Sequence, residues 1–184
     1  MSQPKKAFKP LGIAVLTISD SRSGASDTTG NYLVEVSSGA GHQVQWQQVI
    51  PHNKYRIRDV LSGLIVRPDI AVVLVNGGTG FAEDNQTIAA IKPLLDTEIN
   101  GFGEIFRQLS FADIGAASMQ SQALAGLANR TLIFAMPGSG GAAKLAWERL
   151  IEPQIDARQG PCNFTPHLTD VTCNHAASER SCTD

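Results

Sequence analysis

The sequence predicts an α/β protein, a three-layer sandwich with a mostly parallel central sheet. Apolar runs of strand length at 12–18, 70–75 and 131–135 are rich in Ile, Val and Leu and have no polar face. Strands covered by helices on both sides have this composition. Segments of helical periodicity alternate with these runs, and this alternation is typical of a parallel sheet joined by crossover helices.

In the first half of the chain, two helices and an edge strand follow the run at 12–18. A helix is expected at about 28–40, and the partial alternation of HQVQWQQVI at 42–50 suits a strand nearer the edge of the sheet. The next helix has one apolar face, with Asn53 placed to cap its start. The residues of that face are Ile57, Val60, Leu61, Leu64 and Ile65.

In the second half, periodicity predicts helices at about 87–96 and 141–151. The stretch 101–128 interrupts the strand and helix alternation, and we interpret it as a helical excursion. The strand at 131–135 then precedes the last helix. That helix is expected to bury Ala143, Ala146, Trp147, Leu150 and Ile151.

Length and composition indicate one globular domain. The chain has 184 residues, of which 42% are hydrophobic and 17% charged, so it can close a single core. We expect an N-terminal arm at 1–10, a domain at 11–168, and a tail at 169–184 whose low apolar content predicts disorder.

Charge and hydropathy exclude two classes of partner. The formal net charge of -2 gives no basic field for nucleic acid. No stretch approaches the roughly 20 apolar residues that cross a bilayer, and no secretory signal is evident, so we expect no membrane partner and a cytoplasmic location.

The three cysteines, Cys162, Cys173 and Cys182, are expected to be free thiols. A zinc site that also uses His167 and His175 is conceivable. However, the spacing lacks the paired CxxC of compact zinc sites.

Three strand exits are expected at one edge of the sheet. They are TISDSRS at 17–23, GGTG at 77–80 and MPGSGG at 136–141. Glycines there let main-chain amides approach an anion, and a helix starting near Gly141 would direct its positive end toward a phosphate. One such turn would be explained by tight turning alone, but three converging turns predict a site for a phosphorylated ligand. The candidate contacts are Thr17, Ser19, Gly77, Gly78, Thr79, Gly80, Pro137, Gly138 and Ser139.

Two familiar phosphate motifs do not account for these turns. A Walker loop needs glycine before Lys144, where Ala143 stands. Gly138, Gly140 and Ala143 satisfy GxGxxA, but that fingerprint belongs at the first strand and helix junction, with an acid on a second strand about twenty residues later. A dinucleotide oxidoreductase therefore ranks lower.

Four ordered motifs carry a family resemblance. TISDSRS, GGTG, GFGEIFR and FAMPGSGGAAKLAWERLIEPQ resemble the molybdopterin-binding family of molybdenum cofactor biosynthesis proteins, the Mog and MoaB group, over about 11–168. The resemblance implies a MogA-like fold, a homo-oligomer (trimer or hexamer), and molybdopterin as the ligand. In active members it implies Mg²⁺-dependent adenylyl transfer from ATP to the terminal phosphate of molybdopterin.

The chain departs from the pattern of the active members. They carry aspartates in a PDD-like stretch and in GGTGxxxRD, where this chain reads IPHN and GGTGFAEDN, so His52 and Asn85 align with the two aspartates. Imidazole and a neutral amide are poorer ligands for Mg²⁺ than carboxylates, and Gln122 replaces an expected Arg. We expect a molybdopterin-binding protein with reduced or altered adenylyl transfer. The alternatives are a competent adenylyltransferase using Asp84 or Glu83, and a non-enzymatic carrier or scaffold that binds a nucleotide or a partner.

If the protein is active, the candidate catalytic residues are Asp20, Asp84 and Asn85, with Asp84 as the Mg²⁺ ligand and ATP as co-substrate. Asp20 has an equally weighted interpretation as a turn acceptor. The resemblance places Glu104 in the pterin pocket. Arg107, one turn later, is expected to pair with Glu104 or with a ligand phosphate.

Overall fold

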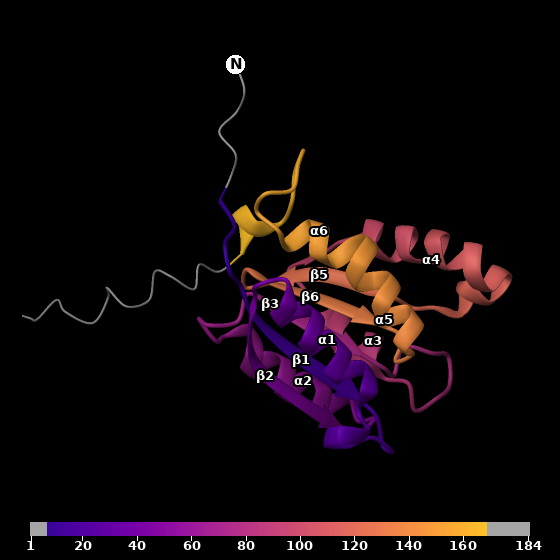
Figure 1. The fold of residues 1–184 in the computed structure, drawn as a ribbon. Coiled ribbons are helices and arrows are strands. Elements are labelled where there is room, and N and C mark those ends of the chain that lie inside the picture. Colours follow the sequence, from indigo (N-terminus) through magenta and orange to yellow (C-terminus); the bar gives the residue numbers. More distant parts are fainter. Residues whose placement is uncertain (1–6, 169–184) are drawn as a thin grey trace, which may run out of the picture.

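The computed structural model describes residues 7–168, which form one six-stranded sheet with helices on both faces (Figure 1). The strand order is β2-β1-β3-β6-β5-β4. The strands are β1 (Gly12–Ile18), β2 (Gln43–Ile50), β3 (Val72–Asn76), β4 (Thr97–Glu98), β5 (Leu124–Ala128) and β6 (Thr131–Met136). β2, β1, β3 and β6 are parallel, whereas β5 and β4 are antiparallel. The mostly parallel sheet and the position of β2 at its edge confirm both predictions.

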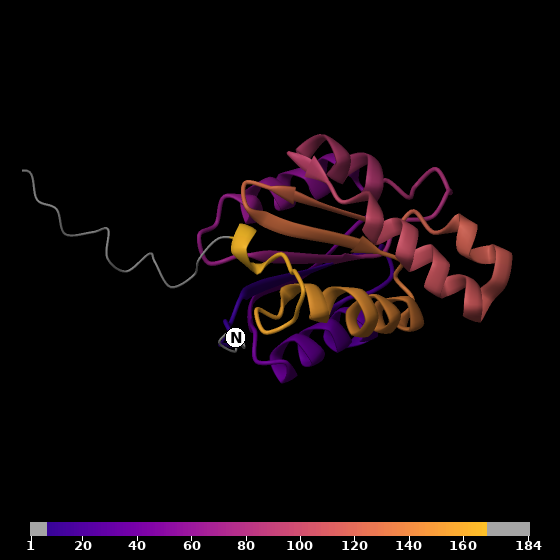
Figure 2. The same ribbon diagram turned by 90° about the horizontal axis from the view of Figure 1, so that it is seen from above.

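The helices complete a three-layer sandwich. They are α1 (Thr28–Gly39), α2 (Lys54–Ile65), α3 (Thr87–Ile91), α4 (Asn100–Ile114), α5 (Gly140–Ala146) and α6 (Glu152–Ile155). A π-helical turn, Trp147–Ile151, connects α5 to α6. Figure 2 shows α1 and α5 on one side of the sheet and α2 and α3 on the other. The predicted three-layer class is therefore confirmed.

The alternation of side chains along each strand supplies both cores. On β1, Ile13 and Val15 pack with α1, α4 and α5, whereas Ala14 and Leu16 pack with α2 and α3. All four are fully buried. Burying an aliphatic side chain of this size stabilises the fold by roughly 1.5–3 kcal/mol, which explains why β1 has no polar face.

One prediction for this part of the chain was wrong. The stretch 101–128 is helical only at first: α4 ends at Ile114, 3-10 turns follow to Gln120, and β5 then joins the sheet. β5 reads LAGLA, whose Leu and Ala favour helix. It is a strand because Asn129 (φ 47°) and Arg130 (φ 63°) form a two-residue hairpin loop with β6.

The helix boundaries differ locally from the sequence pattern. α3 ends at Ile91 rather than near 96, because Pro93 breaks the helical bonding and a 3-10 turn, Lys92–Leu94, follows. Asn53 caps α2 as predicted, its Oδ1 accepting the amides of Tyr55 (3.0 Å) and Arg56 (2.9 Å).

Within residues 7–168 no helix is long and apolar enough to span a membrane. Cys162 is exposed and free, as predicted. The remaining predictions for the C-terminal region lie outside the described residues: those for Cys173, Cys182, His175 and the disorder of 169–184.

His42 lies in a contact between the N-terminal arm and the segment after α6. Its Nδ1 accepts the amide of Leu11 (3.3 Å), and its ring packs against Phe8 with 5.3 Å between centroids. The Arg158 guanidinium lies 4.8 Å from the Phe8 ring. His42 is 5% exposed, so it is a packing residue in an apolar contact.

We expect the protein to lose stability as the pH falls below 6.5. Burial lowers the pKa of His42 from its ordinary value of 6.5; Asp156 opposes this shift and Arg158 adds to it. The unfolded chain therefore binds a proton that the folded protein does not, and the free energy of unfolding decreases below pH 6.5. Arg158 lowers the pKa of Asp156 below 3.8, so the stability contributed by that carboxylate is lost only at lower pH.

Thermal melting between about pH 7.5 and about pH 5 checks this expectation. In His42→Asn the decrease should be smaller, because an amide oxygen can still accept the Leu11 amide but does not titrate. Equal pH dependence in the two proteins would contradict the assignment to His42.

Candidate functional site

The exits of β1, β3 and β6 meet at one edge of the sheet, as predicted. The Gly77 amide donates to the Met136 carbonyl (3.0 Å), and a Cβ on Gly138 would lie 3.2 Å from the Gly77 Cα. The Arg22 guanidinium donates to the Gly138 carbonyl (3.1 Å) and so connects the first turn to the third. We call the three turns, residues 19–23, 77–80 and 137–141, the strand-exit cradle.

Packing is one reason for the glycines of the cradle. Gly77 has φ +96°, and a Cβ there would overlap the Ile18 carbonyl oxygen. Gly78 has φ +63°, and a Cβ there would overlap the Thr87 hydroxyl. The absence of side chains at Gly77 and Gly78 therefore has a structural cause, and the ligand contact expected from the sequence stays a prediction.

Main-chain amides of the cradle remain available to a ligand. Within the described residues, the amides of Gly78, Thr79 and Gly80 donate to no protein acceptor, and those of Gly138 and Ser139 also lack one. Backbone N–H groups are strong hydrogen-bond donors that require a partner when they are covered. Their concentration at the carboxyl ends of parallel strands, with the start of α5 beside them, is the arrangement that binds anions in α/β proteins.

The predicted contacts from the first turn have different surroundings. Thr17 is 1% exposed and donates its hydroxyl to Asp27 (2.6 Å), so it lies beneath the cradle rather than at its surface. The Ser19 hydroxyl accepts the amide of Arg22 (3.2 Å) and holds the turn. Asp20 is exposed and accepts the main-chain amide of His52 (3.0 Å), which supports its interpretation as a turn acceptor.

The other polar residues predicted to contact a ligand differ in their burial. Thr79 is 4% exposed, and its hydroxyl has no partner within the described residues. Ser139 caps α5 by accepting the Ala142 amide (3.3 Å). Asn85 is half-buried beside Gly80, whereas Asp84 is exposed and forms no hydrogen bond or ion pair within residues 7–168. The structure therefore brings Thr79 and Asn85 to the cradle and leaves the Asp84 carboxylate uncommitted.

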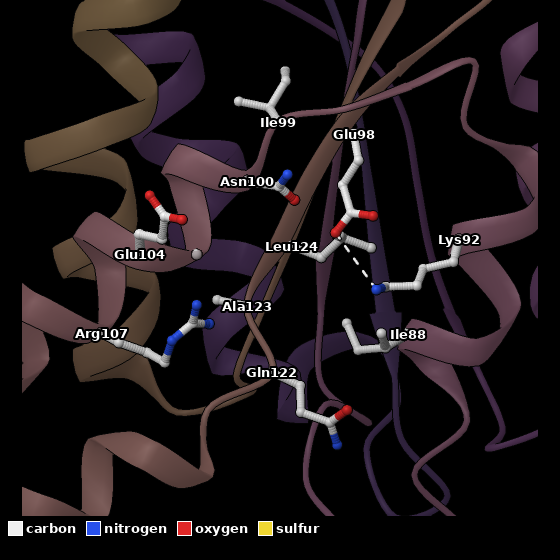
Figure 3. Close-up of a pocket in the computed structure, with 11 residues that line it drawn as sticks. Ile88, Lys92, Glu98, Ile99, Asn100, Glu104, Arg107, Gln122, Ala123 and Leu124 are labelled. Carbon is white, nitrogen blue, oxygen red and sulfur yellow. Dashed lines mark ion pairs between the residues drawn. The ribbon is translucent and has the colours of Figure 1, made fainter.

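A cavity of about 260 Å³ adjoins the cradle, and we call it the α4 cavity (Figure 3). Its polar lining comprises Lys92, Glu98, Asn100, Glu104, Arg107 and Gln122. Figure 3 shows Glu104 and Arg107 on one side and the ion pair of Lys92 with Glu98 on the other. Gln122 connects this cavity to the cradle, because its side-chain amide donates to the Gly80 carbonyl (2.8 Å).

Arg107 is a cation without an acidic partner in the described residues. Its guanidinium donates to the Ser121 carbonyl at 3.4 Å, a long contact, and forms no ion pair. The pairing with Glu104 considered from the sequence is not formed, and Glu104 is exposed. By contrast, Lys92 forms an ion pair with Glu98, with 3.5 Å between its Nζ and the Glu98 Oε1. Arg107 is thus the charged group of the α4 cavity that is available to an anion.

Buried polar atoms without partners gather at the same edge. Within the described residues such side-chain atoms occur on His52, Asn76, Ser121 and Ser37, and the first three border the cradle or the α4 cavity. Buried polar groups are nearly always hydrogen-bonded, so each exception requires an explanation. A bound ligand that supplies hydrogen bonds at this edge is one such explanation.

Two residues of the site were missed at the sequence level. Arg22 joins two of the turns, and Asn76 is fully buried and donates to the Thr17 hydroxyl (2.8 Å). For Asn76 a signal was present, since it is a polar residue that ends an otherwise apolar buried run. For the contact of Arg22 with the third turn there was none, because Gly138 is distant in sequence, although Arg22 also contacts Thr29 and Asp27 nearby in the chain.

The fold and site define a three-layer α/β protein with a candidate ligand site at the carboxyl ends of its parallel strands. Residues 14–157 match the family model described as "Probable molybdopterin binding domain". The chain therefore belongs to the molybdopterin-binding family of molybdenum cofactor biosynthesis proteins.

Individual relatives agree with this assignment. The chain is 51% identical over 168 residues to molybdenum cofactor biosynthesis protein B of Escherichia coli K12, covering 91% of this chain and 99% of that protein. A crystal structure of a molybdenum cofactor biosynthesis protein B is 40% identical, with a TM-score of 0.79, covering 82% of this chain and 94% of the other. A structure of MogA, at 23% identity and a TM-score of 0.68, covers 78% and 97% and confirms the MogA-like fold.

Proposed function

We propose that this protein binds molybdopterin, with the terminal phosphate in the strand-exit cradle and the pterin in the α4 cavity, and that its adenylyl transfer is reduced or absent. The observation that carries the proposal is the set of free amides at Gly78, Thr79 and Gly80, joined through Gln122 to a cavity that contains the uncommitted Arg107.

The two parts of the site suit the two ends of such a ligand. Amides without side chains and an arginine without an acidic partner favour a phosphate, since charge-assisted hydrogen bonds are about twice as strong as neutral ones. The α4 cavity offers amide and carboxylate groups, including Asn100 and Glu104, that could hydrogen-bond the polar edge of a pterin.

Support for catalysis is weaker. Adenylyl transfer to a phosphate requires alignment and neutralisation of charge by a hard cation with oxygen ligands. The family resemblance aligns His52 and Asn85 with two aspartates of the active members. A competent adenylyltransferase that uses the uncommitted carboxylate of Asp84 is the alternative, and a carrier that uses the site for a nucleotide is a further one.

Incubation of the purified protein with molybdopterin, ATP and Mg²⁺ tests the proposal. We expect molybdopterin to raise the melting temperature, because a ligand selective for the folded state stabilises it, and we expect little adenylylated molybdopterin or pyrophosphate. Product at an ordinary enzymatic rate would favour the Asp84 alternative. An unchanged melting temperature would reject the ligand site.

Arg107→Gln should weaken molybdopterin binding by about tenfold, because one charge-assisted contact is lost. Arg56→Gln is the matched control: Arg56 is an exposed arginine paired with Asp59 on α2. Calorimetric titration of both variants measures the effect. Equal affinities in the two variants would remove Arg107 from the site.

We also propose a homo-oligomer. Phe111, Ile114 and Met119, on α4 and the turn after it, are 61%, 57% and 76% exposed, and apolar groups gathered at a surface mark interaction sites. Sedimentation at the monomer mass would contradict this proposal.

The free, exposed thiol of Cys162 is compatible with a reducing cytoplasm, which is the location we propose.

A further inference from the structure

The side chains at the cradle do not fit a magnesium ion. Mg²⁺ demands near-octahedral oxygen coordination and is usually anchored by one or two carboxylates. Within residues 7–168 no group of three or more His, Cys, Asp or Glu side chains could hold a metal ion. Asp20 already accepts the His52 amide with one carboxylate oxygen, and the uncommitted carboxylate of Asp84 is exposed and held by no contact within residues 7–168 that would fix it as a ligand.

His52 offers a different kind of contact at the same place. Its main-chain amide is fixed by Asp20, and its Nδ1 is buried without a hydrogen-bond partner. That nitrogen lies 3.2 Å from the position a Cβ would take on Gly78, a residue whose main-chain amide is free. An imidazole N–H and a main-chain N–H both donate to phosphate oxygens, and neither is a ligand for a hard cation in that form.

Asn85 extends the same donor set. Its side-chain nitrogen lies 2.9 Å from the position a Cβ would take on Gly80. An amide NH₂ supplies hydrogen-bond donors where an aspartate would supply only acceptors. At both positions, where the family resemblance predicts aspartate, His52 and Asn85 therefore offer hydrogen-bond donors to a phosphate.

We propose that the strand-exit cradle binds the phosphate of its ligand without Mg²⁺, with the Gly78–Gly80 amides and the side chains of His52 and Asn85 as hydrogen-bond donors. This inference rests on the proposed function and concerns the same site. It assigns His52 the role of a specificity-determining residue that donates a hydrogen bond directly to the phosphate.

The test is titration of the full-length protein with molybdopterin in two buffers of equal ionic strength, one with excess EDTA and one with excess Mg²⁺. The dissociation constants should agree within about twofold, because no metal bridges protein and phosphate. This comparison uses the wild-type chain, so it does not depend on the folding of any variant.

Variants separate the contribution of His52 from the general fit of the cavity. His52→Ala should weaken binding by about tenfold in both buffers, whereas the matched control His167→Ala, in the 3-10 turn Thr165–His167, should not. The double variant His52→Asp with Asn85→Asp should bind weakly in EDTA and recover by about tenfold with Mg²⁺. Melting temperatures without ligand identify any variant that is misfolded.

The outcomes are distinct. Binding by the wild-type protein only with Mg²⁺ overturns this inference and leaves the proposed function intact. An absence of molybdopterin binding in both buffers overturns the proposed function and this inference with it. Unchanged affinity in folded His52→Ala overturns the role of His52.

Discussion

Replacement of Gly77 by alanine should lower the free energy of unfolding by about 2–5 kcal/mol, since a positive φ and a steric overlap act together. Gly77 has φ +96°, a conformation that side chains other than glycine disfavour. An added methyl group would also overlap the carbonyl oxygen of Ile18 at the end of β1. Relief of that overlap would separate the first and second turns of the cradle, so molybdopterin affinity should fall as well.

Urea unfolding of Gly77→Ala and Gly63→Ala measures this effect against a matched change. Gly63 lies within α2, and a Cβ there meets open space, so alanine should stabilise the protein by roughly 0.5–1 kcal/mol. The two substitutions add the same atoms, but they should change the free energy of unfolding in opposite directions. Similar stabilities for the two variants would show that the β1 and β3 exits do not pack as described.

Asp27→Ala should lower the free energy of unfolding by about 2–4 kcal/mol, because buried donors are left without acceptors. Asp27 is fully buried. Its carboxylate accepts the Thr17 hydroxyl (2.6 Å) and the Gly30 amide (3.0 Å), which caps α1. The Arg22 guanidinium also lies 3.9 Å from this carboxylate and would lose its ion pair.

Asp59→Ala is the control for this change. Asp59 is an exposed acid paired with Arg56 on α2, and surface ion pairs contribute only about 0–1 kcal/mol. Chemical unfolding of both variants measures the difference. A loss at Asp27 as small as that at Asp59 would mean that the carboxylate does not hold the β1 exit to α1.

The sequence correctly predicted the strands and helices in which the local residue pattern and the burial in the folded protein indicate the same structure. β1 and β3 are apolar on both faces, and α2 has both an apolar stripe and the Asn53 cap, so each signal indicates the same structure. β5 was missed because its Leu and Ala favour helix, whereas its strand conformation depends on pairing with β6. Such pairing is a tertiary effect that a local window does not contain.

The convergence of the three turns was predicted from the sequence, whereas the contacts of their side chains were predicted only in part. The convergence of the three turns follows from the parallel sheet, and the structure confirms it. The burial of Thr17 depends on Asp27, ten residues later, and the role of Arg22 depends on Gly138. These partners come together only after folding, so motif spacing alone does not distinguish a supporting hydroxyl from a ligand contact.

The hydrogen bond from Gln122 to the Gly80 carbonyl has a thermodynamic consequence. It connects the wall of the α4 cavity to the loop that offers the free amides, so we expect a molecule that occupies one compartment to bias the conformation of the other. By linkage, a fragment that resembles the pterin should strengthen the binding of free phosphate by the same factor as phosphate strengthens binding of the fragment. The two halves of the site would then respond to occupancy as one cooperative unit.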